Sequence, residues 1–216
     1  ASTEGKKSRK VVEYGINALK AVWHRGAVDA DGKTGDGAGI HLEIPSDFFT
    51  EKIELTGHKH DGSEICVGMI FLPRNNYSAQ ENSRTLVESE LTKSNFSIYG
   101  WRQVPVNPKV LGEKANLTRP EITQVLFKHN DKTLTGKDLE RKIYESRRKI
   151  EKESIKNAIE GFYICSLSSK SIIYKGMFLA ESIAEFYLDL KDERFISRFV
   201  IFHQRFSTNT APSWDL

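Results

Sequence analysis

The chain has 216 residues, of which 38% are hydrophobic and 28% charged, and its 32 lysines and arginines exceed its 29 aspartates and glutamates by three. This length suits one domain with a substantial core, and no apolar run approaches the roughly 20 residues that span a membrane. The basic residues form no stripe of the kind that binds nucleic acid, and no apolar segment follows the basic start, as it would in a secretory signal. We therefore expect a single cytoplasmic domain with no nucleic-acid or membrane contact.

The first part of the chain predicts a helix followed by a strand. Apolar residues recur at steps of three and four from Val12 to Trp23, which indicates a helix that Gly26 ends as a left-handed cap. Residues 38–44 alternate between apolar and polar side chains, as a half-buried strand does. Farther along, the pattern predicts a continuous apolar strand and then a helix, at residues 64–72 and 80–93.

The second part adds further strands and one highly charged helix. The predicted elements are strands at 97–104 and 122–128, a surface helix at 135–157, a hairpin of strands 162–167 and 171–174, a short helix at 179–190 and a buried strand at 199–202. Strands that follow one another directly favour an α+β layered sandwich over a wound parallel sheet.

The two cysteines, Cys66 and Cys165, both lie in apolar runs. This setting predicts buried thiols in a reducing compartment. Neither has a CxxC neighbour, so we expect no zinc site and no other metal.

Two polar segments are candidates for chemistry. Four glycines occur within residues 32–39, and this stretch serves either as a tight structural turn or as an active-site loop. Arg25, just before it, satisfies helix-end carbonyls or reaches a carboxylate. Residues 203–210 follow the last predicted strand and include Arg205, whose guanidinium could grip a carboxylate in a cleft. A hydrogen-bonded loop explains that segment equally well.

Three blocks in order, at residues 24–40, 165–177 and 203–216, resemble the large subunits of glutamate synthases. The first contains His-Arg-Gly-Ala followed by Gly-Asp-Gly-Ala-Gly, and the third contains His-Gln-Arg-Phe-Ser-Thr-Asn-Thr. The resemblance implies the class II glutamine amidotransferase domain with which that family begins. It further implies the N-terminal nucleophile hydrolase fold, a four-layer αββα sandwich, here a single incomplete domain over residues 1–216 that is truncated at both ends.

In that family an N-terminal cysteine attacks the side-chain amide of glutamine while its own α-amino group handles the proton. The ammonia released then aminates 2-oxoglutarate at a flavin domain. By resemblance, Arg205 binds the glutamine carboxylate, and Phe206 and Thr208 shape the pocket. A loop at the catalytic end would hold four further residues: Arg25, Gly35, Asp36 and Gly37.

The chain departs from the family pattern at both ends. It starts at Ala1 without the Cys-Gly pair, so the nucleophile is expected upstream, and the Asn-Gly pair of the oxyanion hole is expected after Leu216. Without these groups we expect the fragment alone to be inactive. The competing readings are a stand-alone, non-catalytic amino-acid-binding or regulatory module and an interaction protein that uses the basic helix at residues 137–156.

The resemblance also implies cofactors and partners. No cofactor is expected in this fragment, whereas FMN and an iron-sulfur cluster are expected in the rest of the parent enzyme. The expected partners are L-glutamine, the downstream synthase domains of the same chain, and a small NAD(P)H-oxidising subunit or ferredoxin. A plastid is the alternative location if the parent is a plant-type enzyme.

Overall fold

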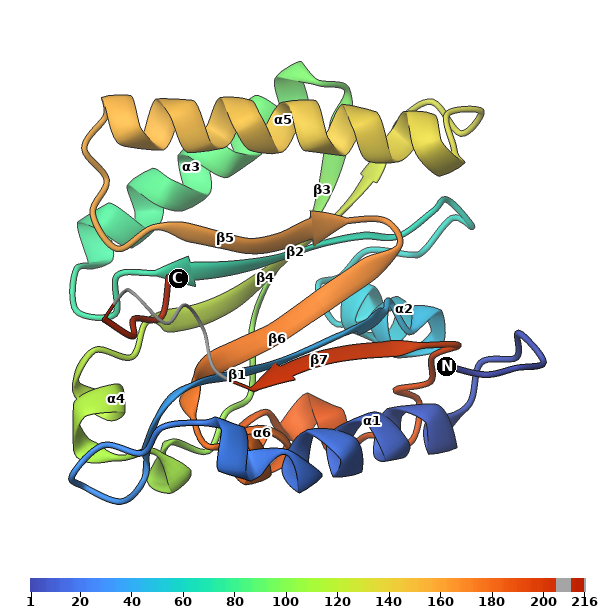
Figure 1. Ribbon diagram of the computed structural model, residues 1–216. Helices are drawn as coiled ribbons and strands as arrows, with labels where there is room; N and C mark the ends of the chain where they lie inside the picture. Colours follow the sequence, from blue (N-terminus) through green and yellow to red (C-terminus); the bar gives the residue numbers. More distant parts are fainter. Residues whose placement is uncertain (205–210, 216) are drawn as a thin grey trace. The chain divides into compact units, whose positions relative to one another are not determined.

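A computed structural model describes residues 1–204 and 211–215 (Figure 1). The chain divides into two compact units, the first made of Ala1–Pro45, Val104–Arg119 and Ile173–Leu216, and the second of Ser46–Gln103 and Pro120–Ile172. Each unit contains one antiparallel sheet with helices, which confirms the predicted α+β class. That residues 1–216 form a single domain stays a prediction.

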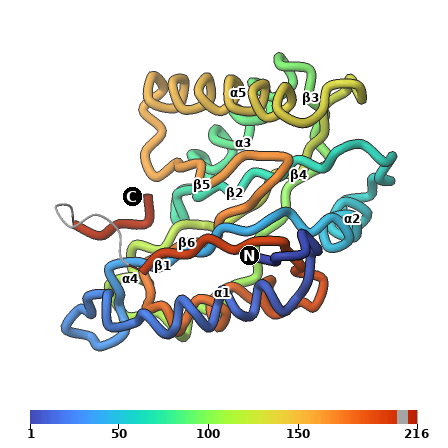
Figure 2. Tube along the Cα trace, turned by 45° about the vertical axis from the view of Figure 1, so that its right-hand side comes forward, coloured from blue at the N-terminus to red at the C-terminus, as the bar shows by residue number. Residues whose placement is uncertain are grey.

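The first unit is built on a three-stranded sheet in the order β6-β1-β7. Its strands are β1 (Thr34–Glu43), β6 (Ser171–Phe178) and β7 (Val200–Gln204). Helix α1 (Arg9–Ala21) runs along β7 (Figures 1 and 2) and begins at Ser8, whose Oγ accepts a hydrogen bond from Val11 N at 3.4 Å. Gly15 lets helix and strand approach closely, because a methyl group there would lie 2.4 Å from Val200 Cγ1.

An aromatic cluster fills the core of the first unit. Tyr174 and Phe178 of β6 pack against Phe186, Tyr187 and Phe195 in mostly edge-to-face pairs, and all five side chains are fully buried. The predicted helix at 179–190 is instead broken into η3 (Ala180–Ser182), α6 (Ile183–Phe186) and η4 (Leu188–Lys191). The break occurs at Tyr187, whose extended backbone (ψ 100°) allows its hydroxyl to donate to Lys175 O at 2.7 Å.

Three short helices complete the first unit: η1 (Trp23–Arg25), η2 (Pro108–Val110) and α4 (Glu113–Leu117). The last two lie in the middle segment of this unit, Val104–Arg119. They bring that part of the chain against β1, since Ala115 N donates to Thr34 Oγ1 at 3.3 Å.

The second unit is built on a four-stranded antiparallel sheet in the order β3-β4-β2-β5. Its strands are β2 (Cys66–Leu72), β3 (Phe96–Gln103), β4 (Glu121–His129) and β5 (Tyr163–Ser168). Its helices are α2 (Ser46–Glu54), α3 (Tyr77–Lys93) and α5 (Gly136–Lys156). Helices α3 and α5 cover one face of the sheet (Figure 1) and share a fully apolar core with it.

Helix α5 confirms the predicted surface helix. Its buried stripe includes Leu139, Ile143 and Ile150, and it ends in a Schellman motif. Its outer face carries ion pairs along the helix, such as Arg147–Glu151 at 2.8 Å. These charges are paired locally, which fits a solvated face better than an interaction surface.

Three further sequence predictions about individual elements are wrong. Residues 162–167 and 171–174 do not form a hairpin, because β5 pairs with β2 in one sheet and β6 with β1 in the other. Gly26 is no left-handed cap, since its φ is −89° and α1 ends before it. Strand β7 is only half-buried, with Ile201 59% exposed.

Candidate functional site

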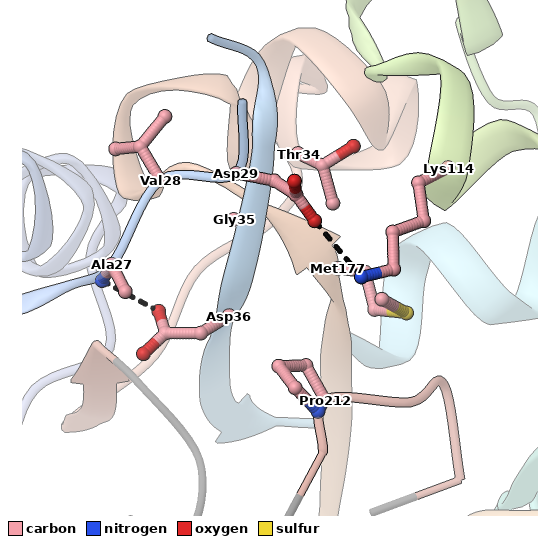
Figure 3. Close-up of a pocket in the computed structure, with 9 residues that line it drawn as sticks. All are labelled: Ala27, Val28, Asp29, Thr34, Gly35, Asp36, Lys114, Met177 and Pro212. Atoms are coloured by element: carbon pink, nitrogen blue, oxygen red, sulfur yellow. Dashed lines mark hydrogen bonds and ion pairs between the residues drawn. The ribbon is translucent and has the colours of Figure 1, made fainter. Parts of the chain in front are cut away.

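The turn that leads into β1 is held by paired hydrogen bonds. Asp36 N donates to Ala27 O at 3.2 Å, while Ala27 N donates to Asp36 Oδ1 at 3.1 Å (Figure 3). The neighbouring residues Val28 and Gly35 form an antiparallel β-bridge next to these hydrogen bonds. The Asp36 carboxylate therefore fixes the segment that follows η1.

Two further aspartates fix the tip of this turn. Asp31 Oδ1 accepts from Lys33 N at 2.9 Å and Thr34 N at 2.7 Å, and its Oδ2 accepts from Thr34 Oγ1 at 2.5 Å. The hydrogen bond from the Thr34 hydroxyl is the main reason that the pKa of Asp31 is strongly lowered. Asp29 pairs with Lys114 at 2.9 Å, and this contact lowers the pKa of Asp29. Both carboxylates therefore stay charged at neutral pH.

A cavity of about 140 Å³ opens between this turn, α4 and β6 (Figure 3). Its lining includes the Asp29–Lys114 pair, Asp36, Met177 and Pro212. Small-molecule pockets usually have about 300 Å³ or more, so this cavity by itself suits a small polar group or a few waters.

The predicted loop of Gly35, Asp36 and Gly37 lies inside β1, which starts four residues earlier than predicted. Glycines occur here because neighbouring atoms leave no room for side chains. A methyl group at Gly35 would lie 2.5 Å from Phe178 O, and Gly37 has a φ of +128°. Arg25 is exposed at the end of η1 and is not among the described residues that line the cavity.

The end of β7 brings two basic side chains together. His203 pairs with Gly39 across the sheet, and a methyl group at Gly39 would lie 2.4 Å from His203 Cε1 and 3.1 Å from Lys175 Cβ. Lys175 is only 6% exposed. Partial removal from water, and then the charge of Lys175, lowers the pKa of His203 and favours a neutral imidazole. Three predicted substrate-binding residues lie outside the described residues: Arg205, Phe206 and Thr208.

Trp214 anchors the chain near its end. Its side chain is buried, its Nε1 donates to Ala115 O at 3.0 Å, and its ring packs on Phe178 and Phe186. A methyl group at Gly176 would lie 2.6 Å from the indole, so the ring rests on the backbone of β6. This anchor fixes Pro212 at the cavity.

Both cysteines belong to the second unit and are buried, as predicted. Cys66 is 0% exposed, and burial, helped by the charge of Glu64, raises the pKa of its thiol far above the usual value. Cys165 is 5% exposed within β5. A nucleophilic cysteine must be reachable by its substrate and must ionise to the thiolate. Burial prevents both for Cys66.

Sequence reasoning missed several of these residues. Lys114 is separated from Asp29 by 85 positions, and no local pattern links them. Lys175 did carry a signal, since it is a charged residue within the apolar run Ile172–Met177, and a charge buried in a strand needs a specific reason.

Two absences concern only the part of the chain that the structure describes. Residues 1–204 and 211–215 contain no group of three or more histidine, cysteine, aspartate or glutamate side chains placed to hold a metal ion. Within the same residues, no helix has both the length and the apolar character required to cross a membrane.

Comparison with known proteins gives consistent matches along the whole chain. The glutamate synthase [NADPH] large chain of Azospirillum brasilense is 56% identical over 216 residues. Ferredoxin-dependent glutamate synthase 2 of Synechocystis sp. is 39% identical over 217 residues, and the chloroplastic ferredoxin-dependent glutamate synthase of Spinacia oleracea is 37% identical over 218 residues. Each match covers 100% of this chain, which spans 13–14% of the length of these relatives.

These relatives agree with the resemblance seen in the three sequence blocks. The profile of the family described as "Glutamine amidotransferases class-II" matches residues 1–216, the entire chain. The two antiparallel sheets with their helices are consistent with that match. The chain therefore belongs to the class II glutamine amidotransferases.

Proposed function

We propose that this chain is the glutaminase portion of a glutamate synthase, which hydrolyses L-glutamine to glutamate and ammonia for transfer to 2-oxoglutarate. The observation that carries the proposal is the 56% identity, over the whole chain, to a glutamate synthase large chain. Membership of the amidotransferase family supports glutamine as the substrate.

Arg205 is the residue proposed to bind the α-carboxylate of glutamine, and Phe206 and Thr208 are proposed to shape the pocket. The position supports this role, since residue 205 directly follows β7, where a strand end can present a side chain to a cleft. A guanidinium binds a carboxylate through two parallel hydrogen bonds, which lysine cannot reproduce.

The substitution Arg205→Lys in the full-length protein tests this role in carboxylate binding. We expect KM for glutamine to rise roughly tenfold or more, with a smaller change in kcat, because charge-assisted hydrogen bonds to the bound substrate are lost. Arg141→Lys on the exposed face of α5 is the matched control and should leave KM unchanged. An unaltered KM in Arg205→Lys would remove the residue from the substrate site.

The nucleophile is proposed to be a cysteine upstream of Ala1. Its sulfur bonds to the amide carbon of glutamine, the carbon–nitrogen bond breaks, and the thiol proton passes through the α-amino group to the departing ammonia. Water then cleaves the thioester to give glutamate and restore the thiol. The burial of Cys66 and Cys165 supports this assignment, since neither is placed to attack a substrate.

The geometry at the start of the chain supports an upstream strand. Ser2 N donates to Arg198 O at 2.6 Å, next to the beginning of β7, and β7 is one of the two outer strands in the described sheet order. An extended segment before Ala1 that ran antiparallel along this edge would need roughly six residues to reach Gln204. Such a strand would bring its first residue beside the end of β7.

The expected inactivity of residues 1–216 alone is part of the proposal. We expect no glutamine hydrolysis by this polypeptide, and turnover in the full-length protein that survives Cys66→Ser and Cys165→Ser together. Glutamate release, measured for all three proteins, checks this. Turnover by residues 1–216 would refute the upstream cysteine, whereas a full-length protein that binds but never hydrolyses glutamine would favour the non-catalytic binding module.

The rest of the parent enzyme is proposed to carry FMN and an iron-sulfur cluster and to draw electrons from a small NAD(P)H-oxidising subunit or ferredoxin. The names of the relatives include both an NADPH enzyme and ferredoxin-dependent enzymes. This proposal gives residues 1–216 no role in that electron transfer.

A further inference from the structure

Lys175 is a buried charged residue in the middle of β6. It is only 6% exposed, and neighbours in the strand such as Tyr174 and Met177 are buried as well. Taking an ammonium group out of water costs free energy that the surroundings must offset. A methionine or leucine would suit the same strand without that cost, so a lysine at this position requires a specific reason.

The backbone around Lys175 is fixed by the aromatic cluster. Tyr187 Oη donates to Lys175 O at 2.7 Å, and Tyr174 Oη donates to Asp189 Oδ2 at 3.0 Å. Both tyrosines are fully buried. These contacts fix the direction in which the Lys175 side chain leaves the sheet.

Lys175 and His203 lie on the same face of the sheet. Successive side chains of a strand point to opposite faces, and Val200 identifies the helix side because it packs against Gly15 of α1. His203, three positions farther along β7, points to the other side and pairs with Gly39. A methyl group at Gly39 would lie 2.4 Å from His203 Cε1 and 3.1 Å from Lys175 Cβ. The glycine therefore leaves room for both side chains over β1.

The charge on this face that acts on His203 is that of Lys175. By strand alternation, β1 and β6 place three charged or titratable groups on the same face as His203: Lys175, His41 and Glu43. Glu43 is paired with Arg198 at 2.6 Å, and the ring of His41 packs edge-on against Phe199. Partial burial, and then the charge of Lys175, lowers the pKa of His203, whose side chain is still exposed.

We propose that Lys175 is a positioning residue of the proposed glutaminase site, where it keeps His203 as a neutral imidazole that accepts a hydrogen bond from bound glutamine. The inference rests on the proposed function, since residue 203 lies two positions before Arg205. A neutral imidazole has one nitrogen that accepts a hydrogen bond, whereas an imidazolium only donates. Glutamine has N–H donors in its α-ammonium group and its side-chain amide, so only the neutral ring can bind them. Lys175 itself does not contact the substrate.

The test follows glutamate release by the full-length protein at different pH values. Protonation of His203 removes the acceptor, so activity falls on the acid side. Removing the positive charge of Lys175 raises the pKa of His203 and moves this loss to higher pH. We expect the ratio of kcat/KM at pH 6 to kcat/KM at pH 8 to fall roughly threefold or more in Lys175→Met, and Lys175→Arg to restore it.

Two further variants separate this effect from a structural one. Lys128→Met is the matched control, because Lys128 is a partly buried lysine of the second unit that pairs with Asp61 at 2.6 Å. It removes the same charge and should leave the ratio unchanged. When His203→Gln is already present, Lys175→Met should not change the ratio further, because the group that titrates is gone.

The outcomes distinguish this inference from the proposed function. Wild-type turnover with equal ratios in Lys175→Met and wild type overturns the inference alone, as does a shift that persists when His203→Gln is present. If Lys175→Met does not fold, Lys175→Gln, which also removes the charge, decides by the same ratio. A wild-type protein without turnover would refute the proposed function, and this inference with it.

Discussion

Ala158 holds a left-handed backbone, with a φ of +49°, at the end of α5. Ala158 N donates to Ile155 O and Ile159 N donates to Ser154 O, both at 3.0 Å, which is the hydrogen-bond pattern of a Schellman motif. Glycine adopts this conformation without the cost of about 1–2 kcal/mol that a side chain imposes. We expect Ala158→Gly to raise the free energy of unfolding in urea by about 0.5–1 kcal/mol.

The matched control for this substitution is Ala18→Gly in the interior of α1. There the backbone is helical, so the same chemical change should lower the free energy of unfolding by about 1 kcal/mol. Equal signs for the two substitutions would contradict the conformational explanation.

Trp214 combines ring packing with one hydrogen bond, and two substitutions separate them. Trp214→Ala should destabilise the protein by about 3–5 kcal/mol, because it removes a large side chain that is 5% exposed. Trp214→Phe keeps an aromatic ring but loses the bond to Ala115 O, and should cost less. Trp23→Ala, at a 61% exposed position, should cost least in the same urea titration.

At the scale of elements, Glu43 joins the end of β1 to the segment that precedes β7. Its carboxylate accepts from Arg198 N at 2.6 Å and from Arg198 Nη2 at 2.6 Å, and it is 5% exposed. Burial acts to raise the pKa of Glu43, but the hydrogen bonds from Arg198 outweigh it, and the net pKa is lowered. The charged form is therefore the one that stabilises this junction.

A lowered carboxyl pKa gives a definite pH dependence. The stabilisation by Glu43 is fully present above the ordinary glutamate pKa of about 4.3, and it is lost as the pH falls through the lower folded-state value. We expect Glu43→Gln to cost about 2 kcal/mol at pH 7 and progressively less at pH 3–4, measured by urea unfolding. Glu13→Gln, on the exposed face of α1, should cost little at either pH.

How well the elements can be predicted from the sequence depends on how local their determinants are. Helix α5 follows from apolar periodicity that lies within its own segment. The choice of strand partner is non-local, so β5 and β6 suggest a hairpin although each pairs elsewhere. The glycines of β1 suggest a loop, because the neighbouring backbone of Phe178 that requires Gly35 is invisible in the sequence.

The residues of the candidate site also differ in how local their determinants are. Asp36 belongs to a motif and could be selected from sequence, whereas the Asp29–Lys114 pair arises only when distant segments meet. The proposed roles of Arg205, Phe206 and Thr208 stay predictions from resemblance.

For the whole molecule, the outer strand β7 presents an association risk. Its residue Ile201 is 59% exposed, and an apolar outer strand can pair with another chain. We expect Ile201→Lys to increase the monomer fraction of residues 1–216 in analytical ultracentrifugation. Leu55→Lys, at a position that is 74% exposed but outside any sheet, should have a smaller effect; a similar effect would point to general surface hydrophobicity instead.

The central place of β1 has a consequence for synthesis on the ribosome. The neighbouring strands of residues 34–43 are β6 and β7, and Val200–Gln204 emerge roughly 160 residues later. At about 5–20 residues per second this delay is on the order of 10–30 s. The second unit has all its strands once Ser168 is made, so the glycine-rich strand that begins the candidate site is among the last to find its place in the nascent protein.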